Sequence, residues 1–338
     1  MATKTTTRAF ELTDFDFDHI VAKDRELPAL GPHDALVKMH AASLNYRDFL
    51  VAKGLYSRSL KLPLIPLSDG AGEVVEVGSA VTRVKRGDRV TPIFMQGWIA
   101  GECNKRAANT ALGGAIDGVL ASERVFNEEG LVHVPSNLSY EEAATLPCAA
   151  LTAWHSLFEK RPIVPGDVVL TLGTGGVSIF ALQLAKAAGA KVIITSSSDE
   201  KLERAKKLGA DIVINYKKEA DWDKPVLKAF PDGVDHIIEV GGAGTLDRSL
   251  KSIRIAGQIS LIGLLAQGQF DATKLLMKSA CMQGIFVGSR EMFERMNKAI
   301  ETHEIKPVID KTFKVDQIKE ALELMVGGGH FGKIVLKF

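Results

Sequence analysis

The chain has 338 residues, of which 46% are hydrophobic and 25% are charged, and it contains 31 glycines. These values are ordinary for a soluble α/β protein and exclude collagen-like and disordered proteins. The length predicts two domains, with a ligand cleft expected between them. The formal net charge of +1, and runs of mixed charge such as Lys201–Lys207, do not indicate a nucleic-acid partner.

The cysteines and the N-terminal residues indicate the cellular compartment of the protein. Cys103, Cys148 and Cys281 are odd in number and far apart, which indicates reduced thiols rather than a disulfide framework or a clustered metal site. The N-terminal residues lack the apolar core of a signal peptide, and no run of about 18 apolar residues occurs. We therefore expect a cytoplasmic protein without a membrane partner.

Before about residue 145, short apolar runs are separated by turn residues. The runs at 34–40, 72–78 and 88–93 are each bounded by Gly, Pro or Asp, which is typical of β-strands. Ser139, with Glu142 three residues later, is a capping-box signature and predicts a helix that begins at Tyr140. The first part of the chain is therefore expected to be mostly β.

Between residues 168 and about 263, apolar runs alternate with helical stretches. The expected strands are 168–172, 191–195, 212–215, 236–240 and 258–262, and the expected helices are 177–188 and 201–208. Strands joined by crossover helices indicate a parallel, doubly wound sheet in an α/β fold. A helix near 293–301 and a closing strand at 333–338 are expected to return to the first domain.

A glycine-rich loop lies between the first of these strands and the helix that follows. Its members are Gly173, Thr174, Gly175, Gly176 and Val177, followed by Ser178. In this position a glycine turn can hold a pyrophosphate against the amides of a helix terminus. Without the flanking strand and helix, the same cluster would be an ordinary turn. Ser178 replaces the third glycine of the fingerprint and is small enough for close packing.

The end of the second expected strand indicates which dinucleotide binds. NAD-specific sites place a carboxylate about 20 residues after the glycine loop, whereas this chain has Thr-Ser-Ser-Ser there. The hydroxyls of Ser196 and Ser197 accept a 2′-phosphate, and Lys201 and Arg204 add positive charge nearby. The sequence therefore favours NADPH over NADH, with the acidic pair at 199–200 as the counterargument.

Several stretches spread over nearly the whole chain resemble the medium-chain dehydrogenase/reductase superfamily. They are Ala41–Asp48, Asp69–Gly78, Gly87–Val90, Ala143–Pro147, Leu151–Trp154, the glycine loop and His330–Val335. The resemblance implies a GroES-like β-rich catalytic domain and a Rossmann domain with a doubly wound parallel sheet. The expected boundaries are 1–140 for the catalytic domain, 141–285 for the cofactor-binding domain and 286–338 for the return to the catalytic domain.

The resemblance also allows the zinc ligands of the superfamily to be compared with the residues of this chain. Zinc-dependent alcohol dehydrogenases of this superfamily have a cysteine ligand at the position of Asn45 and Gly-His-Glu where residues 67–69 read Leu-Ser-Asp. An amide and a hydroxyl do not replace a thiolate and an imidazole as zinc ligands. A structural zinc would need four cysteines, and residues 91–120 contain only Cys103. The chain thus resembles the zinc-free quinone oxidoreductase branch, whose members use NADPH.

The same resemblance implies roles for individual residues. Asn45 would hydrogen-bond substrate or cofactor, Tyr46 would stack on the substrate or donate to its carbonyl, and Tyr216 would pack on the adenosine end of the cofactor. Further cofactor-binding positions would be Thr152, Val240, Gly241, Ile262, Gly263, Leu264, Val287, Ser289 and Arg290. By residue type alone, Tyr46 would be a packing residue, and Asn45 and Asp48 would cap a local turn or helix.

Hydride transfer without zinc limits the substrates. An unactivated ketone is then a poor acceptor, whereas a quinone or an α,β-unsaturated carbonyl delocalises the charge that develops. We expect a homodimer that reduces such a small-molecule carbonyl or quinone with NADPH. Two alternatives remain open: a zinc-free NADP-dependent alcohol or carbonyl dehydrogenase, and a catalytically weak NADPH-binding sensor or structural subunit.

Overall fold

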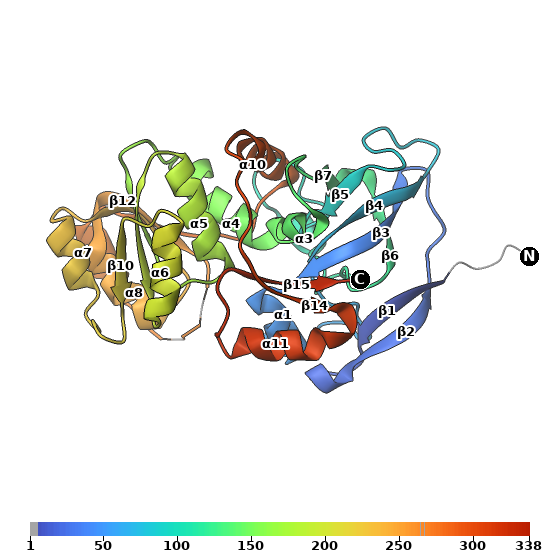
Figure 1. The fold of residues 1–338 in the computed structure, drawn as a ribbon, viewed down its shortest axis with the longest axis horizontal. Helices are drawn as coiled ribbons and strands as arrows, with labels where there is room; N and C mark the ends of the chain where they lie inside the picture. The colour runs from blue at the N-terminus through green and yellow to red at the C-terminus, as the bar shows by residue number, and fades with distance from the viewer. Residues whose placement is uncertain (1–5, 264, 267) are drawn as a thin grey trace, which may run out of the picture. The chain divides into compact units, whose positions relative to one another are not determined.

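The computed structural model describes residues 6–263, 265, 266 and 268–338 and divides into two compact units (Figure 1). The first comprises the chain up to Leu151 together with Val287–Phe338, and the second comprises Thr152–Phe286. We expected the first domain to end at residue 140. The segment that follows instead packs within the first unit, where the amide of Cys148 donates to the Asp69 carboxylate over 3.0 Å.

The first unit is built on a seven-stranded sheet in the order β14-β15-β3-β4-β5-β7, with β6 also paired to β3. Its strands are β3 (Asp34–Ser43), β4 (Asp69–Val77), β5 (Arg89–Pro92), β6 (Glu123–Asn127), β7 (Leu131–His133), β14 (Ile309–Lys314) and β15 (Lys333–Lys337). A separate pair joins β1 (Thr6–Leu12) to β2 (Ile20–Glu26). The C-terminal segment belongs to this unit, where β15 pairs with β3 in antiparallel fashion.

The helices of the first unit are short, apart from two near the C-terminus. They are α1 (Tyr46–Ala52), α2 (Lys105–Ala108), α3 (Tyr140–Ala143), α10 (Arg290–Thr302) and α11 (Ile318–Val326), with short turns of other helix types at Phe17–His19, Glu128–Gly130, Leu146–Ala150 and Val315–Gln317. The predicted capping box is present, because Ser139 N donates to Glu142 Oε2 over 2.8 Å and Glu142 N donates to Ser139 Oγ over 3.2 Å.

The second unit contains a six-stranded sheet in the order β10-β9-β8-β11-β12-β13 (Figure 1). Its strands are β8 (Val168–Thr171), β9 (Lys191–Ser196), β10 (Ile212–Asn215), β11 (Val234–Glu239), β12 (Ile253–Leu261) and β13 (Cys281–Gly284). All neighbouring pairs are parallel. This order, third-second-first-fourth-fifth-sixth along the chain, is that of the Rossmann fold and confirms the predicted doubly wound sheet.

The helices of this unit are α5 (Gly176–Ala187), α6 (Asp199–Lys207), α7 (Asp223–Ala229), α8 (Ala243–Ser252) and α9 (Ala272–Met277), and residues Leu151–Trp154 (α4) and His155–Glu159 precede β8. The core is formed by apolar residues on neighbouring strands, such as Leu170, Ile193, Ile237 and Ile259, all at most 1% exposed. Strands buried on both faces read as continuous apolar runs, which is why the sequence located them.

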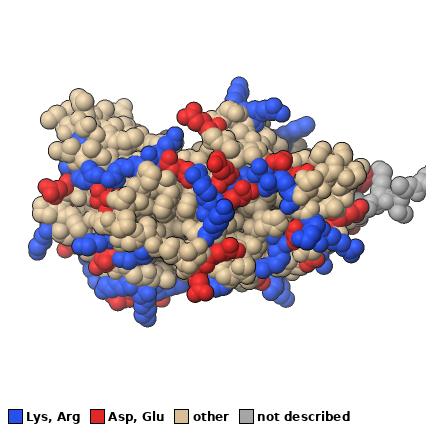
Figure 2. All heavy atoms as spheres, turned by 90° about the horizontal axis from the view of Figure 1, so that it is seen from above, with Lys and Arg blue, Asp and Glu red and all other residues tan. Residues whose placement is uncertain are grey.

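The surface carries charges of both signs. Figure 2 shows Lys and Arg interspersed with Asp and Glu over the face that it draws, as expected for a net charge of +1. Within the described part of the chain, no helix has the length and apolar character needed to cross a membrane.

Candidate active site

The glycine loop connects β8 to α5 at the carboxyl edge of the parallel sheet. Gly173 has a φ of +73°, a left-handed conformation that favours glycine. A Cβ built on Gly173 or on Gly175 would meet no atom within 4 Å. The loop therefore borders open space directly before the N-terminus of the 12-residue helix α5, whose first amides and dipole attract anions. A pyrophosphate fits this cradle.

Ser178, which departs from the glycine fingerprint, is accommodated inside the unit. It is 1% exposed, and its hydroxyl donates to the backbone oxygen of Leu172 over 2.7 Å. The amide of Gly173 donates to Thr195 Oγ1 over 3.2 Å, which ties the loop to β9. The serine thus satisfies its own hydroxyl and leaves the loop open.

The residues expected at the adenosine end lie together at the carboxyl ends of β9 and β10. Ser196 is the last residue of β9 and is buried, and Ser197 follows it half-buried. The amide of Tyr216 donates to the backbone oxygen of Ser196 over 3.0 Å, and the Tyr216 side chain is 41% exposed. Lys201 belongs to the first turn of α6, where its amide donates to Ser198 Oγ.

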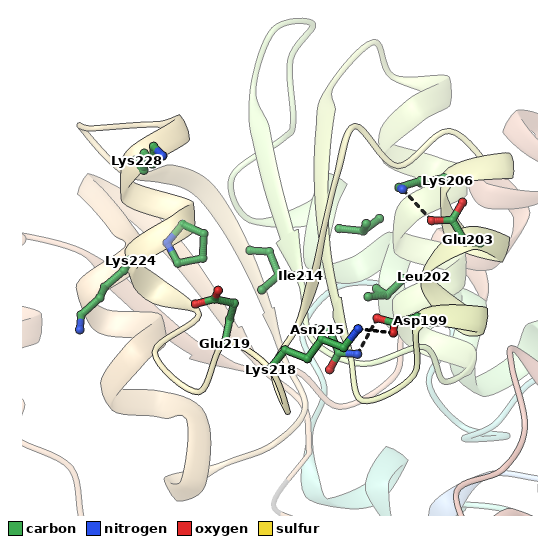
Figure 3. A pocket seen from close by; sticks show the side chains of 12 residues that line it. Asp199, Leu202, Glu203, Lys206, Ile214, Asn215, Lys218, Glu219, Lys224 and Lys228 are labelled. Atoms are coloured by element: carbon green, nitrogen blue, oxygen red, sulfur yellow. Dashed lines mark hydrogen bonds and ion pairs between the residues drawn. The ribbon is translucent and has the colours of Figure 1, made fainter.

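Asp199, whose negative charge would disfavour the 2′-phosphate of NADPH, is paired with a cation. Its carboxylate accepts from Asn215 Nδ2 over 2.7 Å and from Lys218 Nζ over 2.6 Å (Figure 3). The hydrogen bonds from Lys218 and Asn215 hold the pKa of Asp199 below its usual value. The negative charge is therefore compensated by a lysine that follows β10 by three residues.

A pocket of about 640 Å³ lies beside these residues, along the edge strand β10 and between α6 and α7 (Figure 3). Its lining residues are Asp199, Leu202, Glu203, Lys206, Val213, Ile214, Asn215, Lys218, Glu219, Lys224, Pro225 and Lys228. Two pairs of opposite charge lie within this lining, Lys206 with Glu203 and Lys218 with Asp199. None of the predicted cofactor residues lines this pocket.

The turn after β11 is held by the buried carboxylate of Glu239, which the sequence analysis did not single out, and the amide of Ile262 after β12 donates to the Glu239 backbone oxygen over 2.9 Å. Glu239 is fully buried and accepts from Gly241 N over 2.8 Å and from Thr245 Oγ1 over 2.6 Å. The backbone of Gly263 packs on Val240, since a Cβ on Gly263 would lie 2.2 Å from the Val240 oxygen. Val240, Gly241, Ile262 and Gly263 thus share the sheet edge of the glycine loop, and Leu264 lies outside the described residues.

The remaining predicted cofactor residues fall into different units. Thr152 begins the second unit and is buried, and its backbone oxygen accepts from Ser156 Oγ over 2.7 Å. Val287, Ser289 and Arg290 belong to the first unit. Val287 has a φ of +53°, which is rare for a β-branched residue. Ser289 caps α10, and the Arg290 guanidinium pairs with Glu129.

The two predicted catalytic residues begin α1 in the first unit. Asn45 is the N-cap, and its amide donates to Asp48 Oδ2 over 2.7 Å in a capping box. Asn45 is 9% exposed, whereas Tyr46 is 44% exposed, with its ring centroid 5.4 Å from that of Phe49. The backbone amide of Asn45 is therefore committed to the helix cap, its side-chain Nδ2 has no hydrogen-bond partner among the described residues, and Tyr46 is available to a ligand.

Asn45 belongs to a buried cluster of polar groups centred on Lys333, which we call the Lys333 cluster: Asn45, Asp48, Ser68, Asp69, Cys148 and Lys333. The ammonium of Lys333 donates to Asn45 Oδ1 over 2.6 Å and to the backbone oxygen of Leu44. Burial raises the pKa of Asp69, and the charge of Lys333 opposes this shift. Burial lowers the pKa of Lys333, and Asp69 opposes that shift in turn.

The donor atoms of these side chains differ from the usual ligands of a catalytic zinc. A catalytic zinc takes about three ligands from Cys, His and Asp or Glu, but here an amide and a hydroxyl accompany Asp69 and Cys148. Burial raises the pKa of the Cys148 thiol, whereas the thiolate is the form that binds metals. Over the ranges that the structure describes, no group of three or more His, Cys, Asp or Glu is placed to hold a metal ion.

The buried carboxyl group of Asp48 makes the free energy of unfolding depend on pH. Burial raises its pKa to about 6, so the folded state binds a proton more tightly than the unfolded state, and stability falls as the pH rises from about 4 to 6. Asp48→Asn keeps an oxygen for the Asn45 amide and removes this charge. We expect urea unfolding to show a gain of about 1–3 kcal/mol at pH 7 and little change at pH 4. A loss at pH 7 would show that the attraction to Arg47 outweighs the cost of burial.

Comparisons with known proteins agree with this architecture. The family model "Alcohol dehydrogenase GroES-like domain" matches residues 31–136, and "Zinc-binding dehydrogenase" matches residues 176–302. A zinc-type alcohol dehydrogenase-like protein of Schizosaccharomyces pombe is 48% identical over 331 residues, which cover 95% of this chain and 96% of that protein. A quinone oxidoreductase of Rattus norvegicus is 28% identical over 97% of each chain.

A solved structure of a related protein has the same fold. The crystal structure of an NAD-dependent alcohol dehydrogenase superposes with a TM-score of 0.89 at 32% identity, and the match covers 98% of this chain and 99% of that chain. The GroES-like and Rossmann domains expected from the sequence are both confirmed. The chain therefore belongs to the medium-chain dehydrogenase/reductase superfamily and is an oxidoreductase.

Proposed function

We propose that this protein is an NADPH-dependent oxidoreductase that transfers a hydride to a quinone or an α,β-unsaturated carbonyl without zinc. The observation that carries the proposal is an open glycine loop in the Rossmann unit, combined with a donor set in the other unit in which a lysine ammonium binds Asn45. The first feature suits a dinucleotide, and the second does not suit a metal ion.

The preference for NADPH is supported by the charges near the end of β9. Ser196 and Ser197 stand where NAD-specific sites have a carboxylate, and Lys218 compensates the nearest acid, Asp199. Positive charge at Lys201 suits a 2′-phosphate. One solved relative is named NAD-dependent, so a direct comparison of the two cofactors is the decisive measurement.

Each group of residues has a proposed task. Gly173, Thr174, Gly175, Gly176 and Val177 hold the pyrophosphate, while Ser196, Ser197, Lys201 and Tyr216 hold the adenosine end. Thr152, Val240, Gly241, Ile262, Gly263, Leu264, Val287, Ser289 and Arg290 serve the nicotinamide and its ribose. Bound NADPH would supply the hydride, and the protein supplies the alignment of the two reactants.

The proposed substrate class follows from a mechanism that uses no zinc. No Lewis acid polarises a carbonyl in this proposal, so acceptors that delocalise charge by themselves are favoured. Tyr46 is exposed at the start of α1 and can stack on a planar acceptor or donate its hydroxyl proton. The name of the rat relative, quinone oxidoreductase, agrees with this class.

Turnover tests the proposal. Purified protein of known metal content is treated with EDTA and then mixed with NADPH or NADH and a panel of quinones and enones, with cofactor oxidation followed by absorbance. We expect EDTA-insensitive oxidation of NADPH. Oxidation of secondary alcohols with NADP⁺ and no reduction of the panel would favour the alcohol dehydrogenase alternative. Cofactor binding without any turnover would favour a sensor or structural subunit.

We also propose that the protein is a cytoplasmic homodimer. Its cysteines are free, as in a reducing compartment. In the second unit the outer edge of β13 is unpaired within the described sheet, and α9 buries none of its residues. Leu276 and Met277 are 77% and 75% exposed, and apolar side chains of this kind beside a free strand edge mark association surfaces.

Light scattering after size exclusion tests the homodimer. We expect a dimer for the wild type and a monomer for the double variant Leu276→Glu/Met277→Glu, because buried carboxylates at an interface are costly. The control is Leu55→Glu, at a residue that is 64% exposed in the first unit, and it should leave the dimer intact. A dimer that survives the double variant would place the interface elsewhere.

A further inference from the structure

Lys333 is an unusual residue for its place in the fold. It begins the C-terminal strand β15, where Ile334, Val335 and Leu336 are buried, and its own side chain is only 3% exposed. Burying an ammonium is costly unless it is paired and hydrogen-bonded. Packing of β15 alone therefore does not explain why a lysine is buried at this position.

The contacts of Lys333 join three elements of the first unit. From β15, the ammonium donates to the backbone oxygen of Leu44, at the end of β3, and to Asn45 Oδ1, at the start of α1. The buried carboxylate of Asp69, which begins β4, accepts from Ser68 Oγ over 2.6 Å and attracts the Lys333 charge. The ammonium thus contacts the end of β3 and the start of α1 directly, and the carboxylate at the start of β4 attracts it.

Asn45 is consequently held from more than one side. Its backbone amide donates to Asp48 Oδ2, and its side-chain oxygen accepts from the Lys333 ammonium over 2.6 Å. Its side-chain nitrogen Nδ2 is buried and has no hydrogen-bond partner among the described residues. An ammonium only donates, so it fixes which end of the amide is the oxygen and leaves the Nδ2 donor available to a ligand. The neighbouring Tyr46 is the first residue of α1, so its placement depends on the same cap.

We propose that Lys333 is a positioning residue for the reaction: its ammonium provides, from within the chain, the positive charge that a metal ion would bring, and it fixes Asn45 and hence Tyr46. The inference rests on the proposed function, in which Asn45 and Tyr46 meet the substrate. The competing explanation is that Lys333 only neutralises the buried charge of Asp69 and has no specific effect on Asn45.

A double-mutant cycle separates the two explanations. We measure kcat and KM with NADPH and 9,10-phenanthrenequinone for the wild type, Lys333→Met, Asn45→Ala and the double variant. Lys333→Met is expected to lower kcat by about 30-fold with the NADPH Kd nearly unchanged, and to cost less than about 2-fold when Asn45 is already alanine. An equal cost in both backgrounds would overturn the proposal. Lys337→Met, an exposed lysine of the same strand paired with Glu141, is the control and should leave kcat unchanged.

Two further measurements cover the remaining outcomes. If Lys333→Met does not fold, Lys333→Met/Asp69→Asn removes both buried charges together and replaces the single variant in the cycle. If the wild type reduces no quinone or enone, the proposed function fails, and the cycle is then measured by urea unfolding. Coupling between Lys333 and Asn45 in the unfolding free energy would still support the positioning contact, and purely additive effects would overturn it.

Discussion

Gly175→Ala is expected to weaken NADPH binding by about 100-fold, or about 3 kcal/mol, while leaving the free energy of unfolding unchanged. Gly175 has a φ of −78° and a ψ of −179°, which alanine adopts without strain. A Cβ there would meet no protein atom but would occupy the space that a pyrophosphate needs in order to approach the amides of α5. Binding would be measured by fluorescence titration and stability by urea unfolding.

Gly173→Ala is the contrasting variant. Because Gly173 has a φ of +73°, alanine would also cost about 1–2 kcal/mol of stability, so the two variants separate loss of binding from loss of fold. Wild-type NADPH affinity in Gly175→Ala would mean that the glycine loop does not hold the cofactor.

Ser197→Asp is expected to reverse the cofactor preference, with the Kd for NADPH rising by about 100-fold and that for NADH falling or staying constant. Ser197 follows the last residue of β9 and is half-buried. A carboxylate there would repel a 2′-phosphate and accept hydrogen bonds from the two ribose hydroxyls of NADH. The ratio of the two dissociation constants is the measured quantity.

Ser198→Asp is the matched control for this change. Ser198 is the N-cap of α6, with its Oγ accepting from Lys201 N, and aspartate is an equally good cap. The variant therefore adds the same charge one residue further along without disturbing the helix, and the cofactor ratio should change by less than about 5-fold. If both variants shift the ratio equally, the effect is general electrostatics rather than recognition at Ser197.

The Rossmann unit could be read from the sequence because its signals are local. Strands buried on both faces appear as apolar runs, and the glycine loop occupies consecutive positions between a strand and a helix. The capping box at Ser139 likewise involves residues three apart. The boundary after Leu151 was missed because the contact of Cys148 with Asp69 spans 79 residues, and no pattern near residue 140 reveals it.

The Lys333 cluster shows what the sequence could not supply. Lys333 and Asn45 are 288 residues apart, and their contact exists only because β15 pairs with β3. A lysine directly before a run of apolar residues was the one available signal, and it is equally compatible with a solvated strand end. Asp199 is similar, since its pairing with Lys218 requires β10 to lie beside β9.

The central claim is hydride transfer from NADPH to an activated acceptor without zinc. The most direct test measures the rate of NADPH oxidation with 9,10-phenanthrenequinone in protein that has been analysed for metals, before and after EDTA. We expect the same rate in both samples, less than about 0.1 zinc per chain and slower oxidation of NADH. Turnover that is lost on EDTA treatment and restored by added zinc would contradict it.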